Sequence, residues 1–427
     1  MNHEIEFPVP LLSTLLGIAN ILIKDIKINS RGDLIITIVS TEEGTHCHRC
    51  GRKITQSCGH GQEVMLRHLP VFGRKCFIRI IPVRYECSHC KGKKGRAVTT
   101  SQKLFWYEPR SPHTKAFEEH ILLELVNSTV EDVGIKKDLG YGAVEAIIER
   151  RIERQVDWKE MKKLGVLGID EIALKKGHKD FVTIVSAKVN GELVILAVLK
   201  DRLKATVKEF LLSIPKRLRR TVTAVCSDLY EGFINAAKEV FGEKVIVVDR
   251  FHVAKLYRTR LDKLRIKELR RLKQLLSPQD YQRLKNVMWI LRKQNNELTQ
   301  EEREVLEYLF EHSPDLRLAY EFCNELTDIF NETLVKSRGR RKLESWIKRV
   351  RQSGLKCFNT FLDTLAQRMD EITNYFRNRH TSGFVEGLNN KIKVIKRRCY
   401  GLFNVGHLFQ RIYLDLKGYE LFASQRG

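Results

Sequence analysis

The sequence predicts a multidomain protein that combines α+β and α/β parts. Three observations support this prediction: two Cys-x-x-Cys motifs near the N-terminus, a series of apolar runs that end in acids between residues 164 and 253, and a long basic helical stretch after them. With 427 residues and 43% hydrophobic content, the chain is long enough to bury more than one core. We therefore expect several domains along the chain.

The chain is strongly basic, with 76 Lys and Arg residues against 52 Asp and Glu and a formal net charge of +24. This excess favours a polyanionic partner such as DNA or RNA, which a basic protein attracts in a salt-sensitive and sequence-independent way. We find no signal peptide and no apolar run of membrane-spanning length, since the stretch near Leu11 and Leu12 is interrupted and lacks a basic leader. The sequence therefore indicates a cytoplasmic protein without a membrane partner.

Two Cys-x-x-Cys motifs, Cys47 with Cys50 and Cys87 with Cys90, predict a zinc ribbon within residues 1–105. Ten cysteines in a reducing compartment are better explained by metal binding than by disulfides where they cluster. The gap between the motifs is long, but alternating runs such as 76–80 predict strands whose hairpin would return the second motif to the first. Four thiolates close a tetrahedral Zn²⁺ site, so we expect a structural role. The competing ligands nearby are Cys58, Cys76, His46, His48, His60 and His89.

Residues 106–160 predict a helix-turn-helix domain that binds DNA. An apolar stripe at helical spacing lies in the first predicted helix, a break follows at 127–129, and further helices are expected over 130–139 and from Ala143. Arg150 and Arg151 on the third helix are candidate DNA contacts. A small helical linker domain packed on the rest of the chain explains the pattern equally well. The stripe consists of Phe117, Ile121, Leu122 and Leu125.

Residues 161–255 predict the first part of an RNase H-like core, because their elements run strand, strand, strand, helix, strand, helix, strand. The runs 181–185 and 192–196 flank Asn190-Gly191, a hairpin turn signal that makes these strands antiparallel neighbours. A short amphipathic helix is expected over 205–212, and another helix passes through Phe233 and Ala237. The strand over 244–248 closes the series.

Acids end three of the predicted strands: Asp170 after the run 165–169, Asp228 after 221–227 and Asp249 after 244–248. Ligands collect beyond strand ends in open sheets, so we expect these acids to meet Glu386 around metal. Asp170, Asp228 and Glu386 are the candidate catalytic residues and ligands of Mg²⁺ (or Mn²⁺), which would serve an in-line displacement at phosphorus. For each Asp alone, an N-cap or a solvated turn is the commoner role.

Glu386 opens a basic helix within residues 376–427, which are expected to carry the C-terminal helices of the core. Asn390, Lys393 and Arg397 follow it at spacings of four, three and four and share its face, so they are candidate phosphate contacts. An ordinary solvated helix is the alternative. Asp249 and His252 are candidate accessory residues. His252, three residues after Asp249, would orient a phosphate or support Asp249, although a structural histidine explains it as well.

The stretch 256–375 predicts an all-helical insertion in the core. Residues 299–302 have the pattern of a capping box, and Ser313-Pro314 marks a helix start with Pro at its first position. Its basic runs are either a track for DNA phosphates or a solvated surface. Four aromatic residues are interpreted as the core of the insertion: Trp289, Phe310, Phe322 and Phe330.

At these motifs the chain resembles the DDE transposases of the ISL3 family of bacterial insertion sequences. The segments that carry the resemblance are the paired Cys-x-x-Cys motifs, 168–171 (GIDE) with 176–178 (KGH), 227–228 (SD), 249–252 (DRFH), 382–393 (SGFVEGLNNKIK) and 400–401 (YG). The resemblance implies a DDE triad of Asp170, Asp228 and Glu386, an RNase H-like core with a helical insertion before the Glu, and binding to the terminal inverted repeats of the element. It also implies a bacterial protein associated with the nucleoid.

These observations lead us to expect metal-dependent cleavage of DNA at the transposon ends, followed by attack of the freed 3′-hydroxyl on target DNA. Because two DNA ends must be brought together, we expect a homo-oligomer on DNA. One alternative is a zinc-ribbon and helix-turn-helix regulator whose RNase H-like domain is inactive, and another is a structural RNA-binding protein. The acid trio argues against the first, and the second gives no reason for acids at three strand ends.

Overall fold

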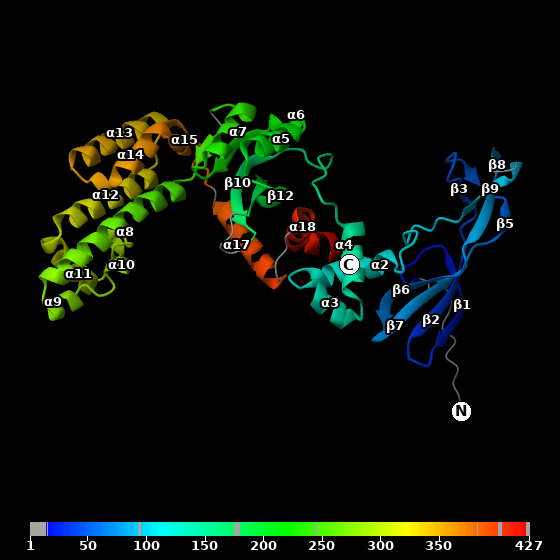
Figure 1. The fold of residues 1–427 in the computed structure, drawn as a ribbon. Coiled ribbons are helices and arrows are strands. Elements are labelled where there is room, and N and C mark those ends of the chain that lie inside the picture. Colours follow the sequence, from blue (N-terminus) through cyan, green and yellow to red (C-terminus); the bar gives the residue numbers. More distant parts are fainter. Residues whose placement is uncertain are drawn as a thin grey trace. The chain divides into compact units, whose positions relative to one another are not determined.

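The computed structural model describes residues 14, 16–92, 95–174, 180–243, 246–381, 383–399 and 404–423. The chain divides into two compact units (Figure 1), the first of Met1–Glu153 with Lys417–Gly427 and the second of Arg154–Leu416. Both strands and helices are present, as the predicted mixture of α and β structure requires. Several sequence features fall outside the described residues: the stretch near Leu11, the KGH segment at 176–178, Ser382 and the YG pair at 400–401.

The first unit contains a sheet with the strand order β1-β2-β7-β6. The strands are β1 (Ile21–Ile28), β2 (Leu34–Ser40), β6 (Val64–Val71) and β7 (Arg74–Ile80). β6 and β7 form an antiparallel hairpin, which confirms the prediction that the chain reverses direction between the two cysteine motifs. Ile38, Leu66 and Ile78 from neighbouring strands are almost fully buried, so this sheet has an apolar core of its own.

Two smaller sheets of the first unit hold the cysteine motifs: Cys47 and Cys50 lie in the turn between the strands of one, and Cys87 and Cys90 lie on a strand of the other. β3 (Thr45–His46) pairs with β4 (Lys53–Ile54), and β8 (Val83–Lys91) lies between β5 (Ser57–His60) and β9 (Ala97–Ser101). The buried cluster around them is small and includes Cys47, Ile54, Tyr85 and Cys87. A cluster of this size provides little hydrophobic stabilisation, which fits a fold that is held by a metal ion.

The three predicted helices of residues 106–160 are present as α2 (Lys115–Leu125), α3 (Val130–Lys137) and α4 (Tyr141–Arg151). Thr114 and Thr129 cap the first two, because each hydroxyl accepts a hydrogen bond from a backbone N–H of the first turn. The predicted break is confirmed at Asn127, whose φ of 59° ends the helical path before Thr129. The whole predicted stripe of α2 is buried, which confirms the helical periodicity.

The second unit contains a sheet with the strand order β12-β11-β10-β13-β14. Its strands are β10 (Gly165–Ala173), β11 (Phe181–Val189), β12 (Glu192–Leu199), β13 (Val222–Ser227) and β14 (Ile246–Val248). β10, β11 and β12 are antiparallel neighbours, with the predicted turn at Asn190-Gly191, whereas β13 pairs in parallel with both β10 and β14. The predicted element order is confirmed, but the prediction that Asp170 ends its strand is wrong, because pairing with β11 continues to Ala173.

Helices cover both faces of this sheet. α5 (Lys204–Ser213), α6 (Lys216–Arg219) and α7 (Glu231–Phe241) follow β12 and β13 in the chain, and their buried side chains pack with Leu167 and Ile169 of β10. α17 (Gly383–Arg398) and α18 (Val405–Phe422) supply side chains to a second cluster that contains Ile172 of the same strand. Since side chains alternate along a strand, Gly168 and Asp170 lie on the face that α17 covers.

The predicted insertion is helical over the described residues between β14 and α17. Its elements are α8 (Arg250–Leu275), α9 (Pro278–Gln282), α10 (Val287–Ile290), η3 (Asn295–Glu297), α11 (Gln300–His312), α12 (Pro314–Asn331), α13 (Lys336–Gln352), η4 (Lys356–Phe358), α14 (Asn359–Gln367), α15 (Met369–Thr373) and α16 (Tyr375–Asn378). The Thr299 capping box and the start of α12 at Pro314 are confirmed. None of the described helices combines the length and the apolar character needed to cross a membrane.

The aromatic core predicted for the insertion is confirmed in part. Phe310, Phe322 and Phe330 are buried, and the indole N–H of Trp346, which is fully buried, donates to the Phe322 carbonyl. The prediction for Trp289 is wrong, because its side chain is 59% exposed and lies beside the Arg292 guanidinium. In a helix as short as α10, the sequence pattern does not show which side faces the core. The side of α10 that is buried carries Val287 and Ile290, and Trp289 lies on the other side.

α17 packs against β10 (Figure 1), and Gly168 of β10 lies at this contact. A Cβ at this position would lie 2.2 Å from Cγ2 of Val385 and 3.0 Å from the Phe384 ring, which is closer than van der Waals contact allows. Glycine therefore lets α17 approach β10 directly. Glu386 is the next residue of that helix, so the approach also sets the position of its carboxylate.

We expect Gly168→Ala to lower the free energy of unfolding by about 1–3 kcal/mol, because the added methyl group overpacks the contact. Val385→Ala alone should also destabilise, through the cavity that it leaves. Combined, the two changes should cost less than the sum of the single costs, since the methyl group added at position 168 occupies space that the Val385 side chain vacates. Urea denaturation of the four proteins measures this, and strictly additive losses would contradict the close approach.

Candidate functional site

The backbone register of the second unit aligns three acids across neighbouring strands. Ile169 of β10 pairs with Ser227 of β13, and Ser227 pairs with Val248 of β14. The next residue in each chain segment is an acid: Asp170, Asp228 and Asp249. Because the three strands are parallel, the acids come to the same edge of the sheet even though Asp170 lies within its strand.

A pocket of about 670 Å³ opens at this edge and brings together the three candidate catalytic acids, Asp170, Asp228 and Glu386. We call it the acid pocket. It also contains the two candidate accessory residues, Asp249 and His252. The remaining residues that line it are Glu171, Phe251, Ala254, Lys255, Arg258, Thr259, Asp262, Arg292, Asn389 and Lys393.

Asp170 is held in place from two sides. One carboxylate oxygen accepts the backbone N–H of Glu171 at 2.8 Å, and the other accepts the side-chain amide N–H of Asn389 at 2.5 Å. Burial raises the pKa of Asp170 despite these two hydrogen bonds and the nearby His252. The carboxylate is thus oriented by α17 but poorly solvated, which favours a bound cation.

The carboxylate of Asp228, like that of Asp170, is both hydrogen-bonded and largely removed from solvent. Its Oδ1 accepts the backbone N–H of Tyr230 at 2.9 Å, which fixes the turn that leads into α7. Burial raises its pKa, and the negative charge of Asp170 raises the pKa further, whereas His252 opposes both effects. Two half-buried carboxylates that repel each other match the oxygen ligands that Mg²⁺ prefers.

The other two acids at the sheet edge have structural partners. Asp249 is buried and caps α8, because its carboxylate accepts the Phe251 backbone N–H at 2.9 Å. Glu171 pairs with the guanidinium of Arg202 at 2.9 Å, so its charge is already balanced. The capping role that sequence reasoning left open for a lone strand-end Asp therefore applies to Asp249.

From α17, Glu386 and Lys393 line the acid pocket as the predicted stripe requires, but Asn390 and Arg397 do not. All four residues are exposed. Sequence reasoning missed Asn389, which is 7% exposed, bonds Asp170 and leaves its own Oδ1 buried without a protein partner. The spacing of three from Glu386 to Asn389 and four to Lys393 is also a helical stripe, so the signal was present in the sequence.

Sequence reasoning also missed the cations that α8 and the segment after α10 bring to the pocket, namely Lys255, Arg258 and Arg292. With Lys393 they line the same pocket as the acids, and Arg292 is paired there with the Asp262 carboxylate at 3.3 Å. An anionic backbone in the pocket would therefore meet cations as well as carboxylates. The available signal was the series of basic residues that follows the acid at position 249 in the sequence.

The candidate DNA contacts of the first unit, Arg150 and Arg151, form ion pairs between helices α4 and α2. Arg150 binds Glu118 at 2.7 Å, and Glu118 is 1% exposed, so this pair helps to hold α4 against α2. Arg151 pairs with Glu119. These contacts give both arginines a structural role, and their binding to DNA stays a prediction.

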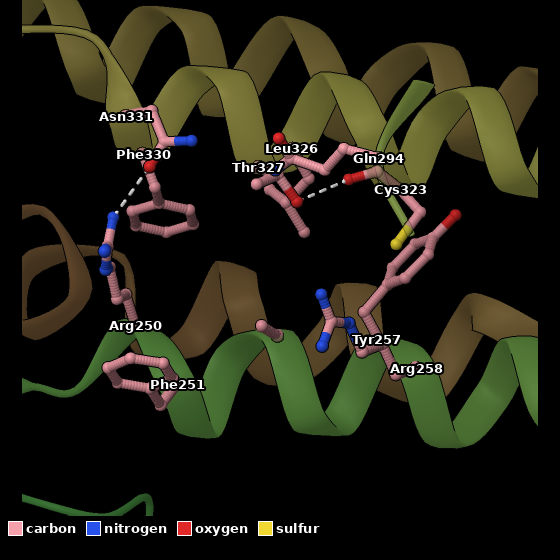
Figure 2. A pocket seen from close by; sticks show the side chains of 11 residues that line it. Arg250, Phe251, Tyr257, Arg258, Gln294, Cys323, Leu326, Thr327, Phe330 and Asn331 are labelled. Carbon is pink, nitrogen blue, oxygen red and sulfur yellow. Dashed lines mark hydrogen bonds between the residues drawn. The ribbon is translucent and has the colours of Figure 1, made fainter. Parts of the chain in front are cut away.

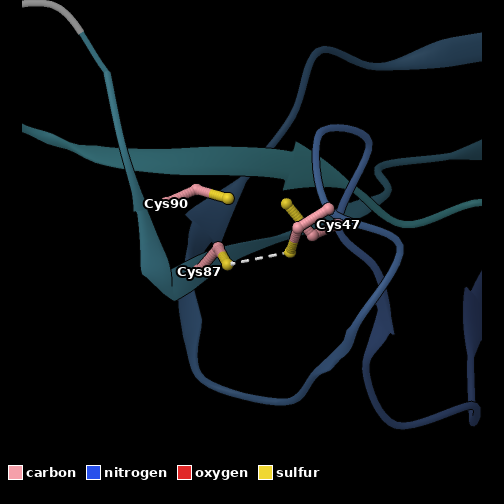
Figure 3. A group of neighbouring side chains, drawn as sticks. Cys47, Cys87 and Cys90 are labelled. Carbon is pink, nitrogen blue, oxygen red and sulfur yellow. Dashed lines mark hydrogen bonds between the residues drawn. The ribbon is translucent and has the colours of Figure 1, made fainter.

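The four predicted zinc ligands converge in the first unit. The sulfur atoms of Cys47, Cys50, Cys87 and Cys90 all lie within 4.8 Å of one another, and Figure 3 shows the Cys47, Cys87 and Cys90 side chains turned toward one another. Cys47 and Cys87 are buried, whereas Cys50 is exposed. Of the competing cysteines, Cys58 and Cys76 are outside the group, and the competing histidines are outside it as well. The arrangement fits a closed tetrahedral Zn²⁺ site.

The surroundings of the cluster favour one ionised thiolate but oppose several. Backbone hydrogen bonds from Cys50 and Arg49 lower the pKa of Cys47 to about 6. Hydrogen bonding with the Cys50 sulfur, together with burial, raises the pKa of Cys90 to about 12. Four adjacent thiolates therefore need a cation to coexist, which is what a bound Zn²⁺ supplies.

We expect Cys87→Ser to lower the zinc content from about one ion per chain to near zero and to unfold the ribbon, because a structural zinc site supplies most of the stability of so small a core. Cys58→Ser is the matched control, since Cys58 is an exposed cysteine of the same region outside the cluster. Elemental analysis gives the zinc content, and limited proteolysis reports the ribbon fold. Retention of zinc by Cys87→Ser would exclude the four-cysteine site.

The raised pKa of Asp228 predicts how stability without metal depends on pH. Between the ordinary carboxyl pKa and the raised one, the folded protein binds a proton that the unfolded chain has lost, so stability falls as pH rises through this window. Asp228→Asn removes the charge and keeps an oxygen for the Tyr230 N–H. In EDTA at pH 7 this variant should therefore melt a few degrees above the parent, and the difference should shrink in acid. Thermal denaturation between pH 3 and 8 tests this, and a lower melting temperature at pH 7 would refute it.

The comparisons with known proteins agree with the motifs. Residues 167–412 match the DDE transposase family of ISL3 elements, a range that includes the aligned acids and α17. The chain is 26% identical over 387 residues to the transposase for insertion sequence element IS1001 of Bordetella parapertussis, which covers 90% of this chain and 92% of that protein. It is 22% identical over 396 residues to the transposase for IS1557 of Mycobacterium tuberculosis, with 88% and 86% covered. The resemblance drawn from the sequence is thereby confirmed, and the chain belongs to the ISL3 family of DDE transposases.

Proposed function

We propose that this transposase binds the terminal inverted repeats of an insertion sequence, cleaves DNA at its ends and transfers the freed ends to target DNA. The observation that carries the proposal is that Asp170, Asp228 and Glu386 line one pocket, which several cationic side chains line as well. In the first step water attacks a phosphorus atom and the 3′ oxygen leaves. In the second step that 3′-hydroxyl attacks a phosphorus atom of the target.

The fold of the second unit supports an RNase H-like core interrupted by a helical insertion. Three antiparallel strands are followed by two parallel ones in the order β12-β11-β10-β13-β14, and acids follow the aligned residues of the parallel strands. The helices from α8 to α16 lie in the chain between β14 and the helix that carries Glu386. We propose the domain division 1–105, 106–160, 161–255, 256–375 and 376–427 on this basis.

Asp170 and Asp228 would hold Mg²⁺ (or Mn²⁺) together with Glu386. The metal would supply positive charge at the attacking and leaving oxygens. Asn389 keeps one oxygen of Asp170 oriented and leaves the rest of the carboxylate to the pocket. Lys255, Arg258, Arg292 and Lys393 would bind the phosphates on either side of the reacting one, so the chain acts by positioning and by charge rather than through a protein nucleophile.

The remaining predicted partners follow from this activity. Asn390 and Arg397 on the exposed face of α17, and Arg150 and Arg151 on α4, are proposed to contact DNA phosphates near the ends. The four-cysteine cluster is proposed to hold a structural Zn²⁺. Because two transposon ends must be held at once, we propose that a homo-oligomer assembles on DNA in the bacterial cytoplasm, at the nucleoid.

A cleavage assay on DNA that carries the element's own ends tests the proposal. The parent protein should cut with Mg²⁺ but not with EDTA, and Asp228→Asn and Glu386→Gln should lower the rate roughly a hundredfold or more, because each removes a ligand oxygen charge. Glu243→Gln is the matched control, since Glu243 is an exposed acid of the same unit outside the pocket. If Glu386→Gln cuts as fast as the parent, the role of this carboxylate is wrong and an inactive DNA-binding regulator becomes the better interpretation.

A further inference from the structure

A second pocket, of about 210 Å³, lies between α8 and α12 in the insertion. Figure 2 shows Arg250, Tyr257 and Arg258 of α8 facing the side chains of α12 across it. No motif of the sequence predicted it. The volume exceeds the space that a single ordered water needs more than tenfold. The residues that line it are Arg250, Phe251, Ala254, Tyr257, Arg258, Gln294, Cys323, Leu326, Thr327, Phe330 and Asn331.

The second pocket is an immediate neighbour of the acid pocket, because three residues line both of them: Phe251, Ala254 and Arg258. Their spacing of three and four residues places them on one stripe of α8. This stripe forms the boundary between the two pockets. A phosphate in the acid pocket and a group in the second pocket would therefore be neighbours across one helix.

The lining of the second pocket suits a flat ring with polar edges. Leu326 and Phe330 provide a buried apolar surface, and Phe251 presents a ring that is 52% exposed at the boundary stripe. Amide and hydroxyl groups come from Gln294 and Thr327. Apolar faces together with a few polar groups are what a nucleobase requires, since its faces stack and its edge forms hydrogen bonds.

Cations border the same space. Arg250 donates to the Asn331 side-chain oxygen at 2.9 Å, which fixes its guanidinium beside the pocket. Arg258 is exposed and belongs to both pockets. A nucleotide has its phosphate attached to its base, so an apolar slot with guanidinium groups at its border and an acid pocket next to it matches the charge pattern of one nucleotide.

We propose that the second pocket receives an unpaired nucleobase of the DNA strand whose phosphate lies in the acid pocket, with Phe251 as the stacking surface and Arg258 between base and phosphate. This inference rests on the proposed function in taking DNA as the substrate. The base is removed from the duplex stack, and the cost of unstacking is offset by contacts in the pocket. Its capture fixes the sugar-phosphate backbone next to it, which positions the scissile phosphate among the acids.

The test uses the full chain and DNA ends in which 2-aminopurine replaces single bases around the cleavage position. One position should show a rise in fluorescence on binding to the parent protein without Mg²⁺, because the base leaves the stack. Thr327→Phe fills the pocket and should abolish the rise. Phe251→Ala should reduce cleavage of intact DNA roughly tenfold through the lost stacking. Leu275→Ala is the control, since it removes an apolar side chain that is 66% exposed on the same helix and lines neither pocket.

A substrate without the base at that position separates this inference from the proposed function. Thr327→Phe, which changes only the second pocket, should cleave the abasic DNA at nearly the parent rate, because no base then has to enter that pocket. Phe251→Ala should lose clearly less activity on the abasic DNA than on the intact DNA, since only its stacking role depends on the base. Equal defects on intact and abasic DNA, or a fluorescence rise that Thr327→Phe leaves unchanged, would overturn the inference while cleavage by the parent still stands. Absence of Mg²⁺-dependent cleavage by the parent would instead reject the proposed function. Circular dichroism confirms that each variant is folded, and Phe251→Ala carries the test if Thr327→Phe is not.

Discussion

The parallel pairing of β10, β13 and β14 is the constraint on which the acid pocket depends. Backbone hydrogen bonds hold Ile169, Ser227 and Val248 in one row, so the acids that follow them cannot separate without breaking the sheet. Bringing Asp170 and Asp228 together in this way is unfavourable, since burial and mutual repulsion raise the pKa of Asp228. The buried apolar residues on both faces of the sheet outweigh that cost. A site that is strained without a cation and rigid in its backbone is suited to bind a divalent ion without rearrangement.

Glu386 reaches the same pocket only because α17 lies directly on β10, and that contact depends on the missing side chain at Gly168. Asn389, one turn further along, then falls opposite Asp170. The same helix therefore supplies an acid, an amide that orients another acid, and the Lys393 cation. Gly168 thus determines where α17 lies, and the position of α17 in turn determines where its three pocket side chains lie.

Much of this arrangement could be predicted from the sequence, because strand ends, turns and caps are local signals. The strands around Asp228 and Asp249, the turn at Asn190-Gly191 and the Thr299 capping box all follow from such patterns. The errors concern what local patterns do not contain. Asp170 continues its strand because β11 pairs beyond it, and Trp289 is exposed because neighbouring elements bury the other side of α10. The sequence prediction named Asn390 as the residue beside Glu386, whereas the structure places Asn389 in the pocket. Neighbouring residues of a helix point about 100° apart, so only the packing of α17 decides which of the two faces the acids.

The long helix α8 links the row of aligned acids directly to the helices that follow β14. α8 begins at the cap provided by Asp249, an acid of the aligned row, and continues without interruption to Leu275. Its first turns therefore line the acid pocket, and its later turns pack with α12. A continuous helix is more rigid than a loop. α8 alone therefore fixes the position of the helices that follow it relative to the aligned acids. The cations and the second-pocket residues that α8 carries are held at a set distance from the carboxylates for the same reason.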